Sequence, residues 1–238
     1  MMLARPRKYS CSHPMPSALR PKDAATLVLI RRDRDPPQVL LGQRHGKHAF
    51  MPNRYVFPGG TVDPTDSRVR PATPLSRHVA QRLERACSPA RARALAVAAI
   101  RETYEETGLM LAKPSPGGPP LNGRKPWADF AARGLAPALD VLDYVARAVT
   151  PPGRPRRFNA RFFMADAIAV SGEIQGSGEL LDIRWFSFAD ALALPIPQIT
   201  QLVIEEVARL LESPPAQDPA RTVPLYRHRH GRDTYSRE

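Results

Sequence analysis

The sequence has few cysteines and no long apolar segment. Cys11 and Cys87 are the only two cysteines among 238 residues, which is too few for a disulfide framework or a cysteine-ligated metal cluster. No run approaches the roughly 18 consecutive apolar residues of a membrane-spanning helix, so we expect no membrane association. Residues 1–22 lack both acidic side chains and an apolar core, which argues against a secretory signal. These absences predict a cytoplasmic protein whose residues 1–22 form a disordered basic leader.

The composition is that of a globular protein with one large domain. Apolar residues make up 42% of the chain, which is ordinary for a soluble fold, and the length allows one full core. We place this domain at residues 23–212 and expect the Pro- and Arg-rich residues 213–238 to be disordered. The net charge of +12 indicates an anionic partner. We expect a phosphorylated small molecule and consider nucleic acid unlikely, although charged disorder explains the excess equally well. The sequence indicates no oligomeric state.

One predicted helix carries three closely spaced carboxylates. Ser88 and Pro89 form a typical helix start and Gly108 a typical stop. Glu102, Glu105 and Glu106 then lie on one face, where two charges about 4 Å apart repel by ~4 kcal/mol at an effective dielectric near 20. A divalent cation relieves that repulsion, and hard oxygen ligands favour Mg²⁺ or Mn²⁺. Taken alone, the pattern fits a solvated acidic helix face about equally well.

A glycine-rich loop precedes this helix. Residues 55–57 read as a short strand that leads into Pro58, Gly59 and Gly60. Paired glycines allow the backbone to approach a phosphate or a metal closely. Together the loop and the helix resemble the signature of the Nudix hydrolase family, G-x5-E-x7-REUxEExGU, where U is apolar. Gly60 matches the first glycine, and residues 101–109 match the second half, with Thr103 in place of one apolar residue.

The spacing inside this signature departs from the family pattern. Asp66 stands where the first glutamate is usual, and Asp63 is a second candidate for its role. The family pattern would place the arginine at 74, but it stands at 101, so 101 − 74 = 27 residues are inserted. We assign the insertion to residues 67–93 and expect it to form an outward flap that includes a short helix. Such an insertion resembles the branch that contains the acyl-coenzyme A diphosphatases.

The resemblance implies a set of site residues. Metal ligands would be Glu102, Glu105, Glu106 and the backbone of Gly60. Arg101 would orient one glutamate, and a further base or ligand is expected from the loop before the last strand, with Glu179 the first choice and Glu173 the second. Substrate-binding residues would be Gly59, Gly60, Arg44 and Arg157, and Arg157 belongs to a basic segment that suits phosphate contacts.

The resemblance also implies an α/β fold, namely a Nudix-type α/β/α sandwich with a mixed sheet between helices. Strand-length apolar runs and helical patterns alternate along residues 23–211 in an order that agrees with it. The implied activity is metal-dependent hydrolysis of a diphosphate linkage in a nucleoside diphosphate joined to another moiety, with coenzyme A or acyl-coenzyme A as candidates. Two alternatives remain: a housecleaning nucleoside triphosphate pyrophosphatase, and a catalytically silent module that binds nucleotides or RNA.

Overall fold

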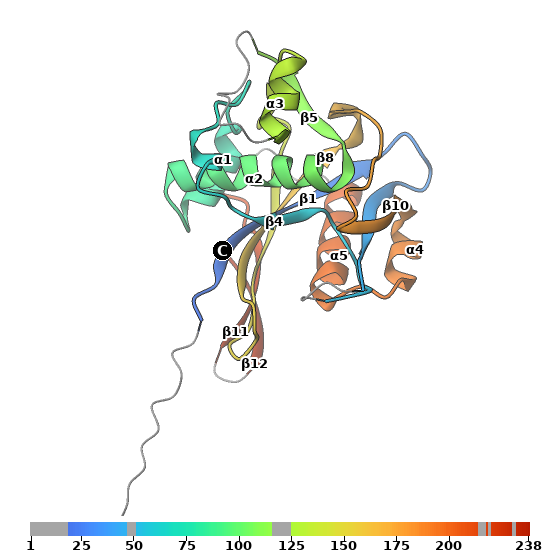
Figure 1. Cartoon of the computed structure of the whole chain (residues 1–238). Coiled ribbons are helices and arrows are strands. Elements are labelled where there is room, and N and C mark those ends of the chain that lie inside the picture. Colours follow the sequence, from blue (N-terminus) through green and yellow to red (C-terminus); the bar gives the residue numbers. More distant parts are fainter. Residues whose placement is uncertain (1–18, 47–50, 116–124, 214–217, 219, 230–231) are drawn as a thin grey trace, which may run out of the picture.

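A mixed β-sheet between helices forms the centre of the protein (Figure 1). The computed structural model describes residues 19–46, 51–115, 125–213, 218, 220–229 and 232–238. Of the predicted leader, residues 1–22, the first 18 lie outside the described residues, and Lys22 already belongs to strand β1. The expected α/β class, with a mixed sheet covered by helices, is confirmed.

The large sheet has the strand order β10-β2-β1-β8-β7-β11-β12, with β3 paired to β2 and β4 paired to β1. Strands β1 and β8 are parallel, as are β7 and β11, whereas the other pairs are antiparallel. A small second sheet has the order β6-β5-β9. The strands are β1 (Lys22–Arg31), β2 (Gln38–Arg44), β3 (Tyr55–Val56), β4 (Gly59–Thr61), β5 (Met110–Pro114), β6 (Leu135–Pro137), β7 (Asp143–Val149), β8 (Phe158–Asp166), β9 (Val170–Ser171), β10 (Leu180–Ser187), β11 (Pro224–Arg229) and β12 (Arg232–Arg237).

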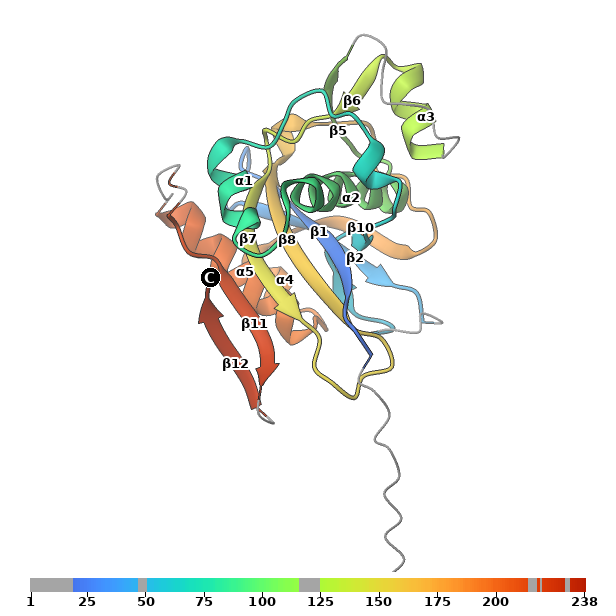
Figure 2. The ribbon, with the colours of Figure 1, turned by 90° about the vertical axis from the view of Figure 1, so that its left-hand side faces the viewer.

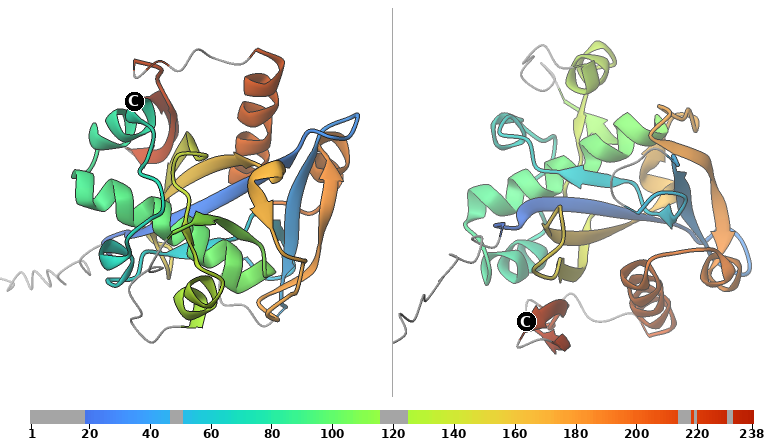
Figure 3. Two further views of the ribbon diagram at one scale, coloured as in Figure 1. Left: turned by 90° about the horizontal axis from the view of Figure 1, so that it is seen from above. Right: turned by 60° about the horizontal axis from the view of Figure 1, so that its bottom comes forward.

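The helices cover both faces of the large sheet. They are α1 (Arg77–Glu84), α2 (Pro89–Thr107), α3 (Lys125–Ala132), α4 (Phe188–Ala193) and α5 (Gln198–Glu212). Helix α2 lies across one face and α5 across the other (Figure 3). Strand β1 alternates accordingly: Leu27 and Leu29 pack in the α2 cluster, while Val28 and Ile30 pack in the α5 cluster. Burial on both faces explains the nearly continuous apolar sequence of β1.

The insertion contributes to the core, so the expectation of an outward flap is wrong. Val79 and Leu83 of α1 are buried in the same cluster as α2, and so is Val69 before it. Helix α2 already begins at Pro89, within the expected insertion of residues 67–93. The insertion therefore extends the helical layer on the α2 face of the sheet (Figure 2).

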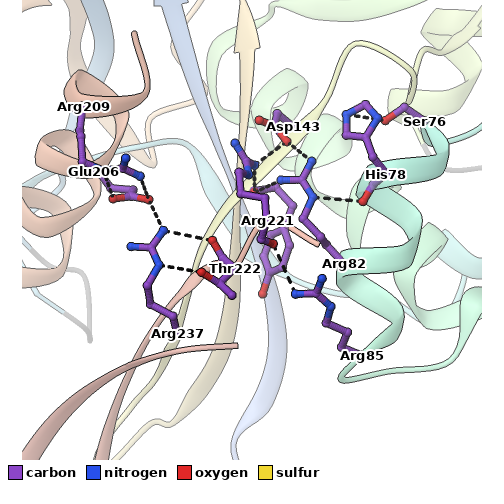
Figure 4. A network of polar contacts seen from close by, with 11 residues as sticks. Ser76, His78, Arg82, Arg85, Asp143, Glu206, Arg209, Arg221, Thr222 and Arg237 are labelled. Atoms are coloured by element: carbon purple, nitrogen blue, oxygen red, sulfur yellow. Dashed lines mark hydrogen bonds and ion pairs between the residues drawn. The ribbon is translucent and has the colours of Figure 1, made fainter. Parts of the chain in front are cut away.

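The C-terminal segment is ordered where the structure describes it, so the expectation of a disordered tail is also wrong. Strands β11 and β12 form a hairpin that extends the large sheet beyond β7. Arg221 donates to Asp143 at 2.8 Å, and Arg237 donates to Glu206 at 3.2 Å (Figure 4). These long-range ion pairs, together with buried Val223 and Leu225, hold the hairpin against the domain.

Turn and cap residues set the ends of some elements. Strand β2 spans residues 38–44, and Ser187 caps α4 by accepting from the backbone N–H of Asp190. Among the described helices, none is both long and apolar enough to cross a bilayer.

Candidate active site

Helix α2 positions the three carboxylates. The Ser88 hydroxyl accepts from the backbone N–H of Arg91, Pro89 occupies the first turn, and Gly108 ends the helix with φ 77°. This agrees with the predicted start and stop. The 19-residue helix places the carboxylates 102 − 89 = 13 to 106 − 89 = 17 residues beyond its start, where α2 crosses β4 and β1. Tertiary packing of the buried residues 94–100 fixes the helix there.

The paired glycines of β4 allow the carboxylates to approach the backbone. The backbone N–H of Gly59 donates to Glu106 Oε2 at 2.9 Å. A Cβ added at Gly60 would lie 2.5–2.6 Å from the carboxylate atoms of Glu102. The absence of a side chain at Gly60 therefore makes room for Glu102, and the loop and helix halves of the signature meet as predicted.

Arg101 is the centre of a buried ion-pair network. Its Nε and Nη2 donate to the two carboxylate oxygens of Asp66 at 2.8 and 3.0 Å, and its Nη1 donates to Glu102 at 2.8 Å and Glu105 at 2.9 Å. Asp66 is 0% exposed and Arg101 is 4% exposed. Burial lowers the pKa of Arg101, but the bonds to Asp66 and the surrounding carboxylates outweigh it and raise that pKa overall. Arg101 is thus fixed in place and orients two glutamates.

This network distinguishes the two aspartates of the loop. Asp66 binds Arg101 and also accepts from the backbone N–H of Asp63 at 2.8 Å. The Asp63 carboxylate accepts from the N–H and hydroxyl of Thr65 at 2.8 and 2.7 Å, so it shapes the turn. Asp66 stands at the position of the family's first glutamate, and that sequence position is the signal for its role.

Glu102 and Glu106 are buried acids with raised pKa values. Desolvation raises the pKa of Glu102 to about 7, against the opposing effect of Arg101. Desolvation also raises the pKa of Glu106 to about 8, against the hydrogen bond from Gly59. Glu106 is 6% exposed and makes no ion pair within the described residues. Ionising these two carboxyls inside the site is therefore costly unless a further cation is bound there.

Arg44 and Glu179 lie at the Glu106 end of the site. Burial lowers the pKa of Arg44, while the charges of Glu106, Glu179 and Glu102 act in the opposite direction. Strand β10 pairs Leu180 with Arg44, which sets exposed Glu179 beside the end of β2. Arg44 and Glu179 are thus within electrostatic range of the helix carboxylates. Glu173 lies in the loop that passes the C-terminus of α2, where its carbonyl lies close to Gly108.

Arg157 lies apart from the carboxylates. Its Nε donates to the carbonyl of Thr150 at 3.1 Å and its Nη1 to the carbonyl of Leu19 at 2.5 Å. These bonds attach the start of β8 to the segment before β1. Arg157 is not among the residues that line the cleft beside Glu102.

A cleft of about 600 Å³ opens beside the site. It runs along α2 from Arg91 to Glu102, beside the start of β1 and the segment from the end of β4 to Pro64. It is lined by Pro21, Lys22, Asp23, Thr61, Val62, Asp63, Pro64, Arg91, Arg101 and Glu102. Sequence reasoning missed Arg91, because it lies in a run of arginines that reads as insertion.

The carboxylates are not gathered as a ready metal site. No three His, Cys, Asp or Glu side chains are close enough to hold a metal ion within the part of the chain that the structure describes. Arg101 accounts for this, because its Nη1 bonds both Glu102 and Glu105. The donor chemistry nevertheless fits a hard divalent cation, since Glu106 is buried and makes no ion pair among the described residues.

Comparison with known proteins agrees with this fold. The crystal structure of a Nudix hydrolase from Alicyclobacillus acidocaldarius is 30% identical, with 79% of this chain and 92% of that chain covered and a TM-score of 0.62. The fold and the paired motifs are those of a hydrolase of phosphorus-containing anhydrides. This chain belongs to the Nudix hydrolase family.

Two curated proteins are also similar. An acyl-coenzyme A diphosphatase of Gallus gallus is 33% identical over 136 residues, which is 48% of this chain and 35% of the relative. A protein called putative nudix hydrolase 7 of Caenorhabditis elegans is 25% identical over 201 residues, which is 76% of this chain and 59% of the relative. The chain thus spans between about a third and three-fifths of the length of these relatives. No protein-family model matches the sequence.

Proposed function

We propose that the protein hydrolyses the diphosphate linkage of a nucleoside diphosphate joined to another moiety, with coenzyme A or acyl-coenzyme A as its substrate. The observation that carries this proposal is Glu106, a buried carboxylate whose one hydrogen-bond donor among the described residues is the backbone of Gly59. Burying such a charge without an ion-pair partner is costly. A divalent cation and an anionic substrate together would complete the site.

Glu102, Glu105, Glu106 and the backbone carbonyl of Gly60 would hold Mg²⁺ or Mn²⁺. When bound, such a cation neutralises diphosphate charge and activates water. The cation would compete with Arg101 for Glu102 and Glu105, because Arg101 bonds both. Asp66 retains two bonds to Arg101 in either case, so the guanidinium stays next to the helix carboxylates.

The chain's own residues supply the remaining roles. Arg101, held by Asp66, orients Glu102 and Glu105. Arg44 provides positive charge for the diphosphate at the Glu106 end. Glu179 is exposed and lies within electrostatic range of Arg44 and Glu106, so it is our candidate for accepting a proton from the attacking water, a role typically worth ~10²–10⁴-fold in rate.

The choice of coenzyme A derivatives is supported by two similarities. The diphosphatase of Gallus gallus named above acts, by its name, on acyl-coenzyme A, and it matches 48% of this chain. The insertion within the signature is the second similarity. Both similarities bear on the class of substrate. Cleavage of a diphosphate linkage is supported by membership of the family, without these two similarities.

The test is a substrate panel with Mg²⁺ or Mn²⁺ and product identification by mass. Coenzyme A, an acyl-coenzyme A, ADP-ribose, a dinucleoside polyphosphate and nucleoside triphosphates form the panel. We expect coenzyme A to give 3′,5′-ADP and phosphopantetheine. Release of pyrophosphate from triphosphates alone would favour the housecleaning alternative, and no cleavage of any compound would favour the silent binding module.

A further inference from the structure

The cleft beside the site has a catalytic end and a distal end. Glu102 and Arg101 line the first, and Arg91 lines the second. Arg91 and Glu102 lie 102 − 91 = 11 residues apart on α2. At 1.5 Å per residue, their Cα atoms are roughly 16 Å apart. A substrate held at Glu102 can therefore extend an arm along the cleft toward Arg91.

Arg91 has hydrogen-bonding capacity to spare. Its side chain is 47% exposed, and its Nε forms an ion pair with Asp23 Oδ2 at 3.3 Å. No other hydrogen bond or ion pair of the Arg91 side chain occurs within the described residues. The terminal nitrogens of Arg91 are thus available to a ligand in the cleft.

Asp23 does not cancel the charge of Arg91, because another cation already pairs with it. Arg161, which is 2% exposed, donates from Nη1 to Asp23 Oδ1 at 2.9 Å, and Asn159 donates to the same oxygen at 2.9 Å. Asp23 therefore balances a buried arginine and also keeps Arg91 beside the cleft. The distal end retains positive charge from Arg91, and Lys22 lies at the same end.

The lining of the cleft restricts what this arm can be. None of the described residues that line it is aromatic, so the cleft offers no stacking platform for a base. Val62 is its one large aliphatic residue, so it is equally unsuited to an acyl chain. An arginine whose terminal guanidinium nitrogens are available can bind a phosphate through two parallel hydrogen bonds.

We propose that Arg91 binds a second phosphate group of the substrate, on the arm that extends from the scissile diphosphate along this cleft. The inference rests on the proposed function, and it assigns to Arg91 the phosphate contact that the sequence assigned to the region of Arg157. The guanidinium of Arg157 instead donates to two backbone carbonyls.

The test compares Arg91→Gln with Arg93→Gln as a matched control. Arg93 is exposed on the same helix, does not line the cleft, and donates to the Ser67 carbonyl at 3.1 Å. Each variant is assayed on coenzyme A and on dephospho-coenzyme A, which lacks the 3′-phosphate. We expect Arg91→Gln to raise KM for coenzyme A by about 10- to 100-fold, as loss of one charge-assisted phosphate contact implies. Its kcat, and its KM for dephospho-coenzyme A, should stay near wild type.

The outcomes separate this inference from the proposed function. If wild-type protein cleaves both compounds and Arg91→Gln changes neither KM, or changes both equally, the inference is overturned while the function stands. An equal effect of Arg93→Gln would also overturn it, because the effect would then be general electrostatics. If wild-type protein cleaves neither compound, the proposed function fails first. Inhibition of wild type, and not of Arg91→Gln, by 3′,5′-ADP would support the phosphate contact independently of turnover.

Discussion

Glu106 is the most deeply buried of the three helix carboxylates, with Glu105 the most exposed. Replacing Glu106 by glutamine removes its charge and preserves its shape. We expect Glu106→Gln to lose most of its activity, because a carboxylate ligand of the proposed cation is gone, and to remain folded. In the presence of a chelator it should melt at a higher temperature than wild type, because the uncompensated charge is gone. Turnover with Mg²⁺ and thermal unfolding with EDTA are the measurements. Near-normal turnover would remove Glu106 from the site.

The same residue predicts a pH dependence of the metal-free protein. The pKa of Glu106 rises from 4.5 to about 8 on folding, so the folded state binds its proton more tightly than the unfolded state. Its contribution to stability is therefore fully present below pH 4.5 and is lost as pH rises through 8. The melting-temperature gain of Glu106→Gln over wild type should grow across this range. A gain that does not change with pH would contradict the burial of this charge.

Asp66 is the one acid of the site that is both fully buried and bound twice to Arg101. Asp66→Asn removes its charge and leaves Arg101 without its main partner. Removing one member of a buried ion pair typically costs ~3–5 kcal/mol, and we expect a loss of that order in urea unfolding. Asp63→Asn, which affects a turn, should cost less. Equal losses would mean that Asp63 shares the role of Asp66.

The local features of the site could be predicted from the sequence, because they depend only on residues close together in the chain. Helix start, helix stop and the spacing of Glu102, Glu105 and Glu106 depend on neighbouring residues. The role of Asp66 depends on a contact with Arg101, 35 positions later in the chain. Its place six residues after Gly60 made it a candidate, but only burial and geometry separate it from Asp63.

At the scale of elements, the short helix predicted within residues 67–93 is present as α1, but the sequence did not indicate that it packs into the core. Residues 67–93 are rich in Arg, Ala and Pro, which is typical of an exposed loop. The structure shows that four apolar residues of this segment, Val69, Val79, Leu83 and Ala92, enter the core. A few apolar side chains are enough to anchor a charged segment in the core when they pack against a sheet and a neighbouring helix.

Helix α1 therefore contributes to stability. We expect Leu83→Ala, at a side chain 2% exposed, to cost about 2–5 kcal/mol in urea unfolding. Gln81→Ala, on the exposed side of the same helix, should stay within about 0.5 kcal/mol. Small effects of both, with a change in KM alone, would restore the flap interpretation.

The C-terminal hairpin was not predicted from the sequence for a related reason. Proline and arginine dominate residues 213–238, a composition that indicates disorder when read locally. The partners of these arginines, Asp143 and Glu206, lie on β7 and α5. Long-range ion pairs of this kind leave no local signal in the sequence.

Asp143 joins the insertion to the C-terminal segment. It accepts from Arg82 of α1 and from Arg221, each at 2.8 Å, and Arg82 is 2% exposed (Figure 4). We expect Asp143→Ala to cost about 3–5 kcal/mol, because it leaves a buried arginine unpaired. Asp140→Ala removes a more exposed pair with Lys113 and should cost about 1 kcal/mol or less. If urea unfolding shows similar losses for the two variants, the buried ion pairs of Asp143 stabilise the fold no more than an exposed ion pair does.

At the scale of the whole molecule, the chain carries a net charge of +12 and its proposed substrate is a polyanion. Long-range attraction of this kind is screened beyond about 8 Å at physiological ionic strength. We expect KM for the diphosphate substrate to rise with salt while kcat changes little. Steady-state kinetics across a salt series, with circular dichroism as a check on folding, provide the test. A KM independent of salt would confine recognition to direct contacts.

The parallel pairing of β7 with β11 has a consequence for synthesis of the chain. Strand β7 ends at Val149 and β11 begins at Pro224, 224 − 149 = 75 residues later. Until residues 224–229 have left the ribosome, the β7 edge of the nascent sheet has no partner. Unpaired edges readily recruit other chains, and incomplete domains expose them longest. We therefore expect the nascent protein to need chaperones at the β7 edge until the C-terminal hairpin docks.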